Sequence, residues 1–165
     1  FGSVKLVPAW HSSSLGPNHR ALGVPCGFVA QLHEERIYHA GDTALFGDMA
    51  LIGGEAPLDL ALLPIGGHYT MGVSDAVRAV QFLAPRLVIP MHYNTWDVIH
   101  ADPRVFRQCV DGETRARCII LAPGEQSSVR SPILPLRTVC PAVAAAGTTV
   151  VTAAFGSPAR QPLHR

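Results

Sequence analysis

The chain has 165 residues, 48% hydrophobic and 15% charged, a balance typical of one globular domain with a substantial core. Its formal net charge is only +1 at pH 7, so we expect neither a nucleic acid nor an anionic membrane surface as a partner. No apolar run is long enough to span a membrane and no signal-peptide pattern opens the chain, so a cytoplasmic protein is expected.

The first part of the chain reads as strands followed by a helix. Residues 4–10 (VKLVPAW) and 26–32 (CGFVAQL) are short β-type runs separated by a loop of Ser, Gly, Pro and Asn. Residues 36–40 (RIYHA) follow a polar turn, so 26–40 is predicted to be a hairpin. Residues 45–53 (LFGDMALIG) are predicted to form a short helix that ends at Gly53-Gly54.

The second part alternates strands and helices. Residues 59–66, 86–92 and 116–124 are apolar runs typical of strands, the first two of them covered on both faces. Ser74 is expected to cap a helix that runs to about Leu83, and Pro103 to open one that runs to Val110. The order β-β-β-α-β-α-β-α-β predicts an α/β layered domain with a mixed sheet.

The C-terminal residues have an unusual composition. All twelve acidic residues lie between Glu34 and Glu125, and residues 126–165 contain none, while they hold four arginines and five prolines. We therefore divide the chain into a folded domain, 1–125, and a low-acid tail, 126–165, that is expected to be disordered. The alternative is a genuine final strand at 147–155 (GTTVVTAAF).

The four cysteines are scattered and form no CxxC pair, so reduced thiols are expected, with neither a zinc knuckle nor a disulfide framework: Cys26, Cys109, Cys118 and Cys140.

Three polar side chains stand at the ends of predicted strands. His11 follows the first strand, Asp42 follows the glycine after residues 36–40, and His92 ends residues 86–92. Loops that leave strands of the same sense gather at one edge of an α/β sheet. Two imidazoles and a carboxylate there are a ligand set for Zn²⁺, Mn²⁺ or Fe, and a bound metal ion would acidify a water toward a pKa of ~7. A serine hydrolase through Ser12–Ser14 lacks the G-x-S-x-G elbow.

Five segments carry a family resemblance: VPAWHSSS (7–14), GFVAQL…RIYHAGDTALFGDMALI (27–52), DLALLPIGGHYTMGVSDAV (59–77), VIPMHYNT (88–95) and LAPGE (121–125). In this order they resemble the C-terminal half of the metallo-β-lactamase-fold hydrolases. The nearest branch comprises uncharacterised metal-dependent hydrolases similar to ascorbate-6-phosphate lactonase-like proteins. The resemblance implies half of an αββα sandwich, with a mixed sheet and helices on one face.

The resemblance also assigns residues. His11 resembles a ligand of the family's first metal ion, Asp42 the carboxylate that bridges two ions, and His92 a ligand of the second ion. Asp42 and His92 are thus the expected catalytic residues. The glycine before Asp42 would let the backbone turn tightly enough for one carboxylate to reach both ions.

Four further residues are expected to contact the substrate or to surround the metal ligands: Thr43, His68, Tyr93 and Asn94. Thr43 would orient Asp42 or be an ordinary turn hydroxyl, and His68 would line the pocket. His39 is expected to be a structural histidine.

The family's first metal motif, His-x-His-x-Asp-His, should precede His11 and does not occur here. One hypothesis is therefore a parent metal-dependent hydrolase with two ions, Zn²⁺ first among them, that cleaves an ester, lactone or phosphoester of a small molecule. The other is a catalytically inactive fragment that binds metal or a partner weakly. An apolar sheet face left uncovered would favour a homo-oligomer.

Overall fold

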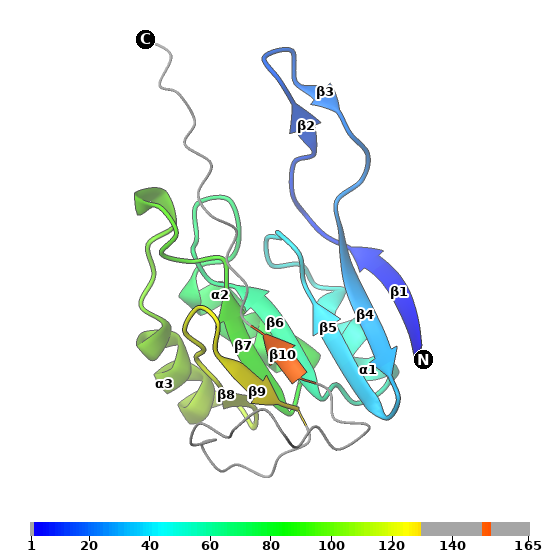
Figure 1. Cartoon of the computed structure of the whole chain (residues 1–165), viewed down its shortest axis with the longest axis vertical. Coiled ribbons are helices and arrows are strands. Elements are labelled where there is room, and N and C mark those ends of the chain that lie inside the picture. The colour runs from blue at the N-terminus through cyan, green and yellow to red at the C-terminus, as the bar shows by residue number, and fades with distance from the viewer. Residues whose placement is uncertain (1, 130–149, 153–165) are drawn as a thin grey trace.

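We describe a computed structural model, which defines residues 2–129 and 150–152. A six-stranded mixed sheet forms its centre, with strand order β1-β4-β5-β6-β7-β8 (Figure 1). β1, β4 and β5 are antiparallel neighbours, and β5 to β8 run parallel. The strands span Gly2–Pro8 (β1), Cys26–Leu32 (β4), Glu35–His39 (β5), Leu60–Pro64 (β6), Leu87–Met91 (β7) and Arg117–Cys118 (β8). The predicted α/β class, mixed sheet and 26–40 hairpin are confirmed.

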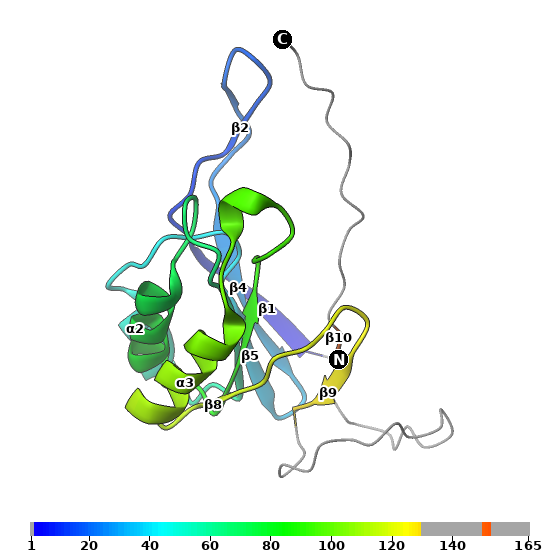
Figure 2. The same cartoon turned by 90° about the vertical axis from the view of Figure 1, so that its left-hand side faces the viewer.

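The helices lie on one face of this sheet, as Figure 2 shows. They are α1 (Met49–Glu55), α2 (Val73–Leu83) and α3 (Pro103–Glu113), and a 3-10 turn, η1, covers Asp97–Ile99. α2 buries one apolar stripe against the sheet and ends at Ala84, which has a left-handed backbone before a proline. The Asp102 side chain caps α3 by accepting from the Arg104 amide, 2.8 Å away.

Several predicted element boundaries were wrong. α1 begins at Met49 rather than at residue 45, and the Gly53-Gly54 pair lies inside it, where α1 packs against α2. Ser74 is already helical and makes no capping bond, since Gly72 holds the cap position of α2. The strand expected over 116–124 is regular only at β8. Ile119 still donates to the carbonyl of Val88, but the next residue of β7 that could pair there is Pro90, which has no N–H.

Two small ribbons complete the described part. β2 (Ser14–Leu15) pairs with β3 (Arg20–Ala21), and β9 (Gln126–Ser128) pairs with β10 (Val150–Thr152), all antiparallel. β10 lies within the alternative strand expected at 147–155, and β9 shows regular structure beyond residue 125. The other residues of the expected tail, 130–149 and 153–165, lie outside the described residues, as does Cys140.

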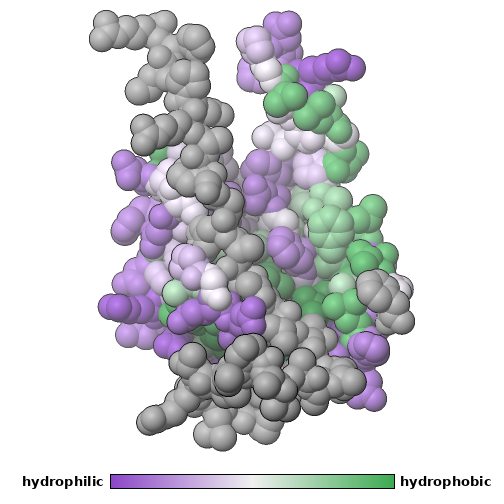
Figure 3. Space-filling view, viewed as in Figure 1, coloured by the Kyte–Doolittle hydropathy of each residue, from purple (hydrophilic) through white to green (hydrophobic). Residues whose placement is uncertain are grey.

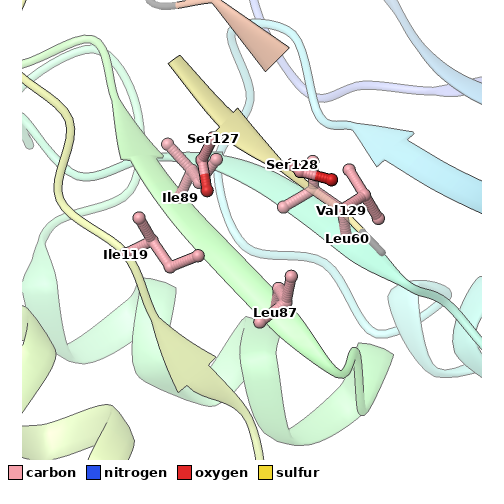
Figure 4. A pocket seen from close by; sticks show the side chains of 7 residues that line it. All are labelled: Leu60, Leu87, Ile89, Ile119, Ser127, Ser128 and Val129. Carbon is pink, nitrogen blue, oxygen red and sulfur yellow. The ribbon is translucent and has the colours of Figure 1, made fainter. Parts of the chain in front are cut away.

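The sheet face opposite the helices is apolar and only partly covered. Its centre is an aliphatic cluster that Val129 closes, held by a hydrogen bond from Arg86 to the Val129 carbonyl. The shallow pocket between β9 and the sheet is lined by aliphatic side chains and two serines, so it offers no ionisable group (Figure 4). Toward β1 and β4 this face shows a hydrophobic surface (Figure 3). Leu6 and its cross-strand partner Phe28 are 64% and 39% exposed.

None of the helices within residues 2–129 has the length and apolar character needed to cross a membrane.

The cysteines of the described part are unpaired and differ in environment. Cys26 and Cys109 are half-buried, whereas Cys118 is buried between β7 and α3. Burial, reinforced by the Asp111 carboxylate, raises the pKa of the Cys118 thiol to about 12.

This difference predicts selective labelling. Because the raised pKa keeps Cys118 protonated, a thiol reagent at pH 8 should modify Cys26 and Cys109 but not Cys118 in the folded chain. Raising the pH to 9 should still leave Cys118 unreactive. Peptide mass spectrometry gives the sites, and labelling of all three in urea is the control. Equal native rates at Cys118 and Cys109 would contradict the assignment.

A buried arginine joins β5 to the end of α1. The Arg36 guanidinium donates to the carbonyls of Ile52 and Ala56 and pairs with the Glu55 carboxylate at 2.8 Å. These bonds satisfy carbonyls at the helix C-terminus that have no partner within the helix. The exposed Lys5 reaches the same Glu55 carboxylate from β1, at 2.9 Å.

We expect Arg36→Leu to lower the free energy of unfolding by about 1–3 kcal/mol, since it leaves helix-end carbonyls without a donor. Urea unfolding followed by circular dichroism measures this change. Lys5→Met is the matched control: it removes only a solvent-exposed pair and should shift the midpoint little. The reverse order of effects would show that the buried arginine is not the stabilising partner.

Candidate metal centre

Five strands end at the same edge of the sheet. β5, β6, β7 and β8 run parallel, and β1 runs in their direction because β4 is antiparallel to both β1 and β5. Their exits therefore meet at the edge that lies toward the top of Figure 1. The residues that follow these strands include His11, Asp42 and His92, the three that the sequence placed at strand exits, and also His68.

Asp42 and His92 face each other at this edge. The distance from Asp42 Oδ2 to His92 Nε2 is 3.6 Å, and the two side chains are 47% and 31% exposed. That separation is too long for a hydrogen bond. Two atoms that bind one tetrahedral zinc ion at 2.0–2.1 Å lie about 3.4 Å apart, so the pair is spaced like two ligands of one ion.

Gly41 sets the position of Asp42. Its backbone has a φ of +66°, and a Cβ there would lie 2.7 Å from the carbonyl oxygen of Cys26 on β4. Both the conformation and the close approach require glycine. The tight turn expected before the carboxylate is therefore present.

His92 is held in an unusual conformation. Its φ is +54°, in the left-handed region that few residues other than glycine adopt, so the surrounding packing must maintain it. Gly66, after β6, passes so close that a Cβ would lie 2.4 Å from the His92 carbonyl oxygen. The Nδ1 atom of His92 is buried without a hydrogen-bond partner among the described residues.

His11 is not brought into a three-residue group with this pair. Its half-buried ring contacts its own loop instead, with Nδ1 2.8 Å from the Ser12 carbonyl. Across residues 2–129 and 150–152, no three or more His, Cys, Asp and Glu side chains gather closely enough to hold a metal ion. The backbone nevertheless anchors His11 beside the site, because Trp10 exchanges hydrogen bonds with Thr43 and Ala44.

Thr43 connects strand exits. It is fully buried, and its hydroxyl accepts from the Trp10 amide at 2.9 Å and donates to the Ala44 carbonyl at 2.8 Å. Its carbonyl accepts from the amide of Met71 in the loop after β6. Both hydroxyl bonds thus go to backbone, the ordinary turn role rather than a bond to the Asp42 carboxylate.

Tyr93 and Asn94 lie in the loop after His92 and act within it. Tyr93 is half-buried against the helix-side core, and burial raises its pKa. Asn94, with a φ of +56°, accepts from the Ala101 amide through Oδ1 and donates to the Ile99 carbonyl, so it organises the loop. Their assignment to the substrate or metal shell stays a prediction.

His39 ends β5, and Gly41 donates its amide to His39 Nδ1 at 3.1 Å. Desolvation of the ring lowers the pKa of His39, while the nearby Asp42 carboxylate acts in the opposite direction. A neutral ring is the form that can accept the Gly41 bond. His39 is therefore a structural histidine at the turn, as expected.

His68 lies in the loop between β6 and α2. It is exposed, has a φ of +55°, and packs edge-to-face on Tyr69, with ring centroids 4.2 Å apart. Sequence reasoning missed the aromatic group at this edge, which includes Trp10, Tyr69 and Trp96. The signal available was that each aromatic residue follows a strand that ends at this edge.

The family of the chain follows from comparison. A family model described as the Beta-lactamase superfamily domain matches residues 1–93, more than half of the chain. The chain belongs to this family, and the predicted metallo-β-lactamase fold is confirmed.

The curated relatives of the chain are named metal-dependent hydrolases. The chain is 54% identical over 125 residues to a UPF0173 metal-dependent hydrolase of Pelotomaculum thermopropionicum, a match that covers 74% of this chain and 55% of the relative. It is 54% identical over 121 residues to the UPF0173 metal-dependent hydrolase TK0141 of Thermococcus kodakarensis, with 73% and 52% covered. The chain thus spans about half the length of these relatives. The finer likeness to ascorbate-6-phosphate lactonase-like proteins stays a prediction.

Solved structures share the architecture. The metallo hydrolase Igni18 of Ignicoccus hospitalis matches with a TM-score of 0.66 and 43% identity, covering 74% of this chain and 50% of that one. An isothiocyanate hydrolase from Delia radicum gut bacteria matches with a TM-score of 0.57, 21% identity, and coverage of 74% and 52%. At that identity the second likeness shows the fold alone.

The close approach at Gly66 yields a prediction. A methyl group there would meet the His92 carbonyl and the Ile99 side chain at 2.4 and 2.8 Å, so the backbone that carries His92 must shift. We expect Gly66→Ala to lower the free energy of unfolding by about 1–3 kcal/mol. Gly47→Ala, where nothing lies within 4 Å, is the control and should stay within about 0.5 kcal/mol of the parent in urea unfolding. If both substitutions lowered the free energy of unfolding equally, the close contact between Gly66 and the His92 carbonyl would not be the cause.

Proposed function

We propose that this chain forms part of a metal-dependent hydrolase that cleaves an ester, lactone or phosphoester bond in a small-molecule substrate. The observation that carries the proposal is the 3.6 Å separation of Asp42 Oδ2 and His92 Nε2 at the edge where five strands end. The names of the curated relatives, metal-dependent hydrolases, support it.

A divalent ion at this position would supply a Lewis acid that polarises the scissile bond and acidifies a coordinated water. The chain's own residues would do the rest. Asp42 provides a carboxylate oxygen, and His92 provides the lone pair of Nε2, which requires its ring proton to sit on Nδ1. That buried Nδ1–H then needs an acceptor, so we propose that groups beyond the described residues complete the surroundings of His92.

We assign Zn²⁺ as the preferred ion, with Mn²⁺ or Fe²⁺ as alternatives, because imidazole and carboxylate suit all three. A hydrolytic zinc site has three protein ligands and an open position, and the described residues bring only two side chains together. His11 is the proposed third ligand, since its backbone neighbour Trp10 is bonded to the Asp42–Thr43 turn. In the whole protein the site would hold two ions.

A cytoplasmic location and a homo-oligomer remain proposals. The open sheet face around Leu6 and Phe28 offers an apolar surface for association between copies.

The proposal predicts specific losses of metal binding. Asp42→Asn and His92→Ala should each weaken Zn²⁺ binding by at least about tenfold, because each removes one of the two converging ligands. Calorimetric titration of the purified chain measures the affinity. Hydrolysis of p-nitrophenyl acetate, a phosphodiester and a γ-lactone by the loaded chain then tests the bond that is cleaved.

Matched controls lie far from the edge. Glu113→Gln changes an exposed carboxylate at the last residue of α3, and His33→Asn changes the β4–β5 turn, where asparagine tolerates the positive φ. Both should bind Zn²⁺ like the parent chain. Unaltered Zn²⁺ binding by the Asp42 and His92 variants would refute the site.

A further inference from the structure

Aromatic side chains are exposed at the edge that holds Asp42 and His92. The exposed fractions of Trp10, Tyr69 and Trp96 are 68%, 51% and 51%. Tyr69 and Trp96 stack with ring centroids 5.9 Å apart and planes within 10° of parallel. A stacked pair that remains half exposed leaves aromatic surface open to a further planar group.

The stack is built from the loops that flank the candidate metal centre. Tyr69 lies in the loop after β6, which is fastened to the Asp42–Thr43 turn by the bond from Met71 N to Thr43 O, 3.2 Å. The same loop is closed by a bond of 2.9 Å from Gly67 N to Met71 O. The aromatic ring thus belongs to a braced loop, not to a free one.

Trp96 comes four residues after His92, in a loop that is also closed on itself. Asn94 donates to the Ile99 carbonyl and accepts from the Ala101 amide, both at 2.9 Å. The stack therefore joins the loop that carries His92 to the loop that is bonded to the Asp42 turn.

The charges around the stack limit what it can bind. Neither the β6–α2 loop (residues 65–72) nor the segment 92–99 contains a lysine or arginine, and Asp97 is the one carboxylate in the two segments. A polyphosphate would find no counter-charge from these loops. An uncharged planar group finds open aromatic surface.

We propose that the Tyr69–Trp96 stack is a specificity wall that binds a planar, apolar ring of the substrate, so that aryl or cyclic unsaturated esters are favoured over small aliphatic ones. The assignment rests on the proposed hydrolase function, because it places the ring beside the bond that the metal centre would cleave. Tyr69 and Trp96 are thereby specificity-determining residues and not metal ligands.

The test compares two anions that differ only in the ring, phenylphosphonate and methylphosphonate. Each is titrated into the ¹⁵N-labelled, Zn²⁺-loaded chain, and amide shifts give the dissociation constants. The chain has only two tryptophans, so its two indole N–H signals report directly on Trp10 and Trp96. We expect phenylphosphonate to bind about tenfold more tightly and to shift the Trp96 indole signal.

Substitutions separate a binding role from a structural one. Trp96→Leu and Tyr69→Leu should each reduce the preference for the phenyl group to less than about threefold. Tyr69→Phe keeps the ring and should keep the preference. Phe82→Leu, which removes an aromatic ring from α2, should also keep it. A ratio near one in the parent chain, or an unchanged ratio in folded Trp96→Leu, would overturn the proposal.

A second pair of titrations separates this proposal from the hydrolase function. If Zn²⁺ binds but the two phosphonates bind equally, the aromatic wall is wrong and the metal centre stands. If Zn²⁺ does not bind, the titrations are repeated in EDTA with benzyl alcohol and ethanol. A preference for benzyl alcohol that Trp96→Leu abolishes then supports the wall alone, and no preference overturns it as well.

Discussion

The candidate site depends on the bonds that hold strand exits together at Thr43. One fully buried threonine accepts the Trp10 amide through its hydroxyl and the Met71 amide through its carbonyl. These bonds fix the exits of β1 and β6 to the turn that carries Asp42. The topology of the sheet brings the loops to a common edge. Specific hydrogen bonds between those loops then set the distances between the side chains of the site. Thr43 is therefore a positioning residue whose contribution a ligand list would omit.

Two glycines serve the same end by allowing the backbone to approach closely. Gly41 passes the Cys26 carbonyl, and Gly66 passes the His92 carbonyl. Neither could carry a side chain without moving Asp42 or His92. The left-handed backbone of His92 is a strained conformation that comes with this arrangement. Such conformations persist only where the surrounding packing maintains them.

The parts of the fold that the sequence predicted are those with local or periodic causes. α2 follows from its apolar stripe, and the pairing of Asp42 with His92 follows from strand ends that share a direction. The short β8 was missed because Pro90 acts on a neighbouring strand and not on its own. The Tyr69–Trp96 stack was missed because two loops, 27 residues apart in sequence, set it. The turn after Trp10 decides where the His11 ring points, and its sequence has no periodicity that reveals this.

Two features of the described residues need a common explanation. At the edge of the sheet, His92 Nδ1 is buried without a partner and only two ligands converge. On the face opposite the helices, Leu6 and Phe28 remain exposed, whereas the helix side holds the larger buried core. One additional layer packed on that face would bury the apolar residues and bring donors and acceptors to the same edge. The resemblance to an αββα sandwich predicts such a layer, and a layer in that position would account for both features at once.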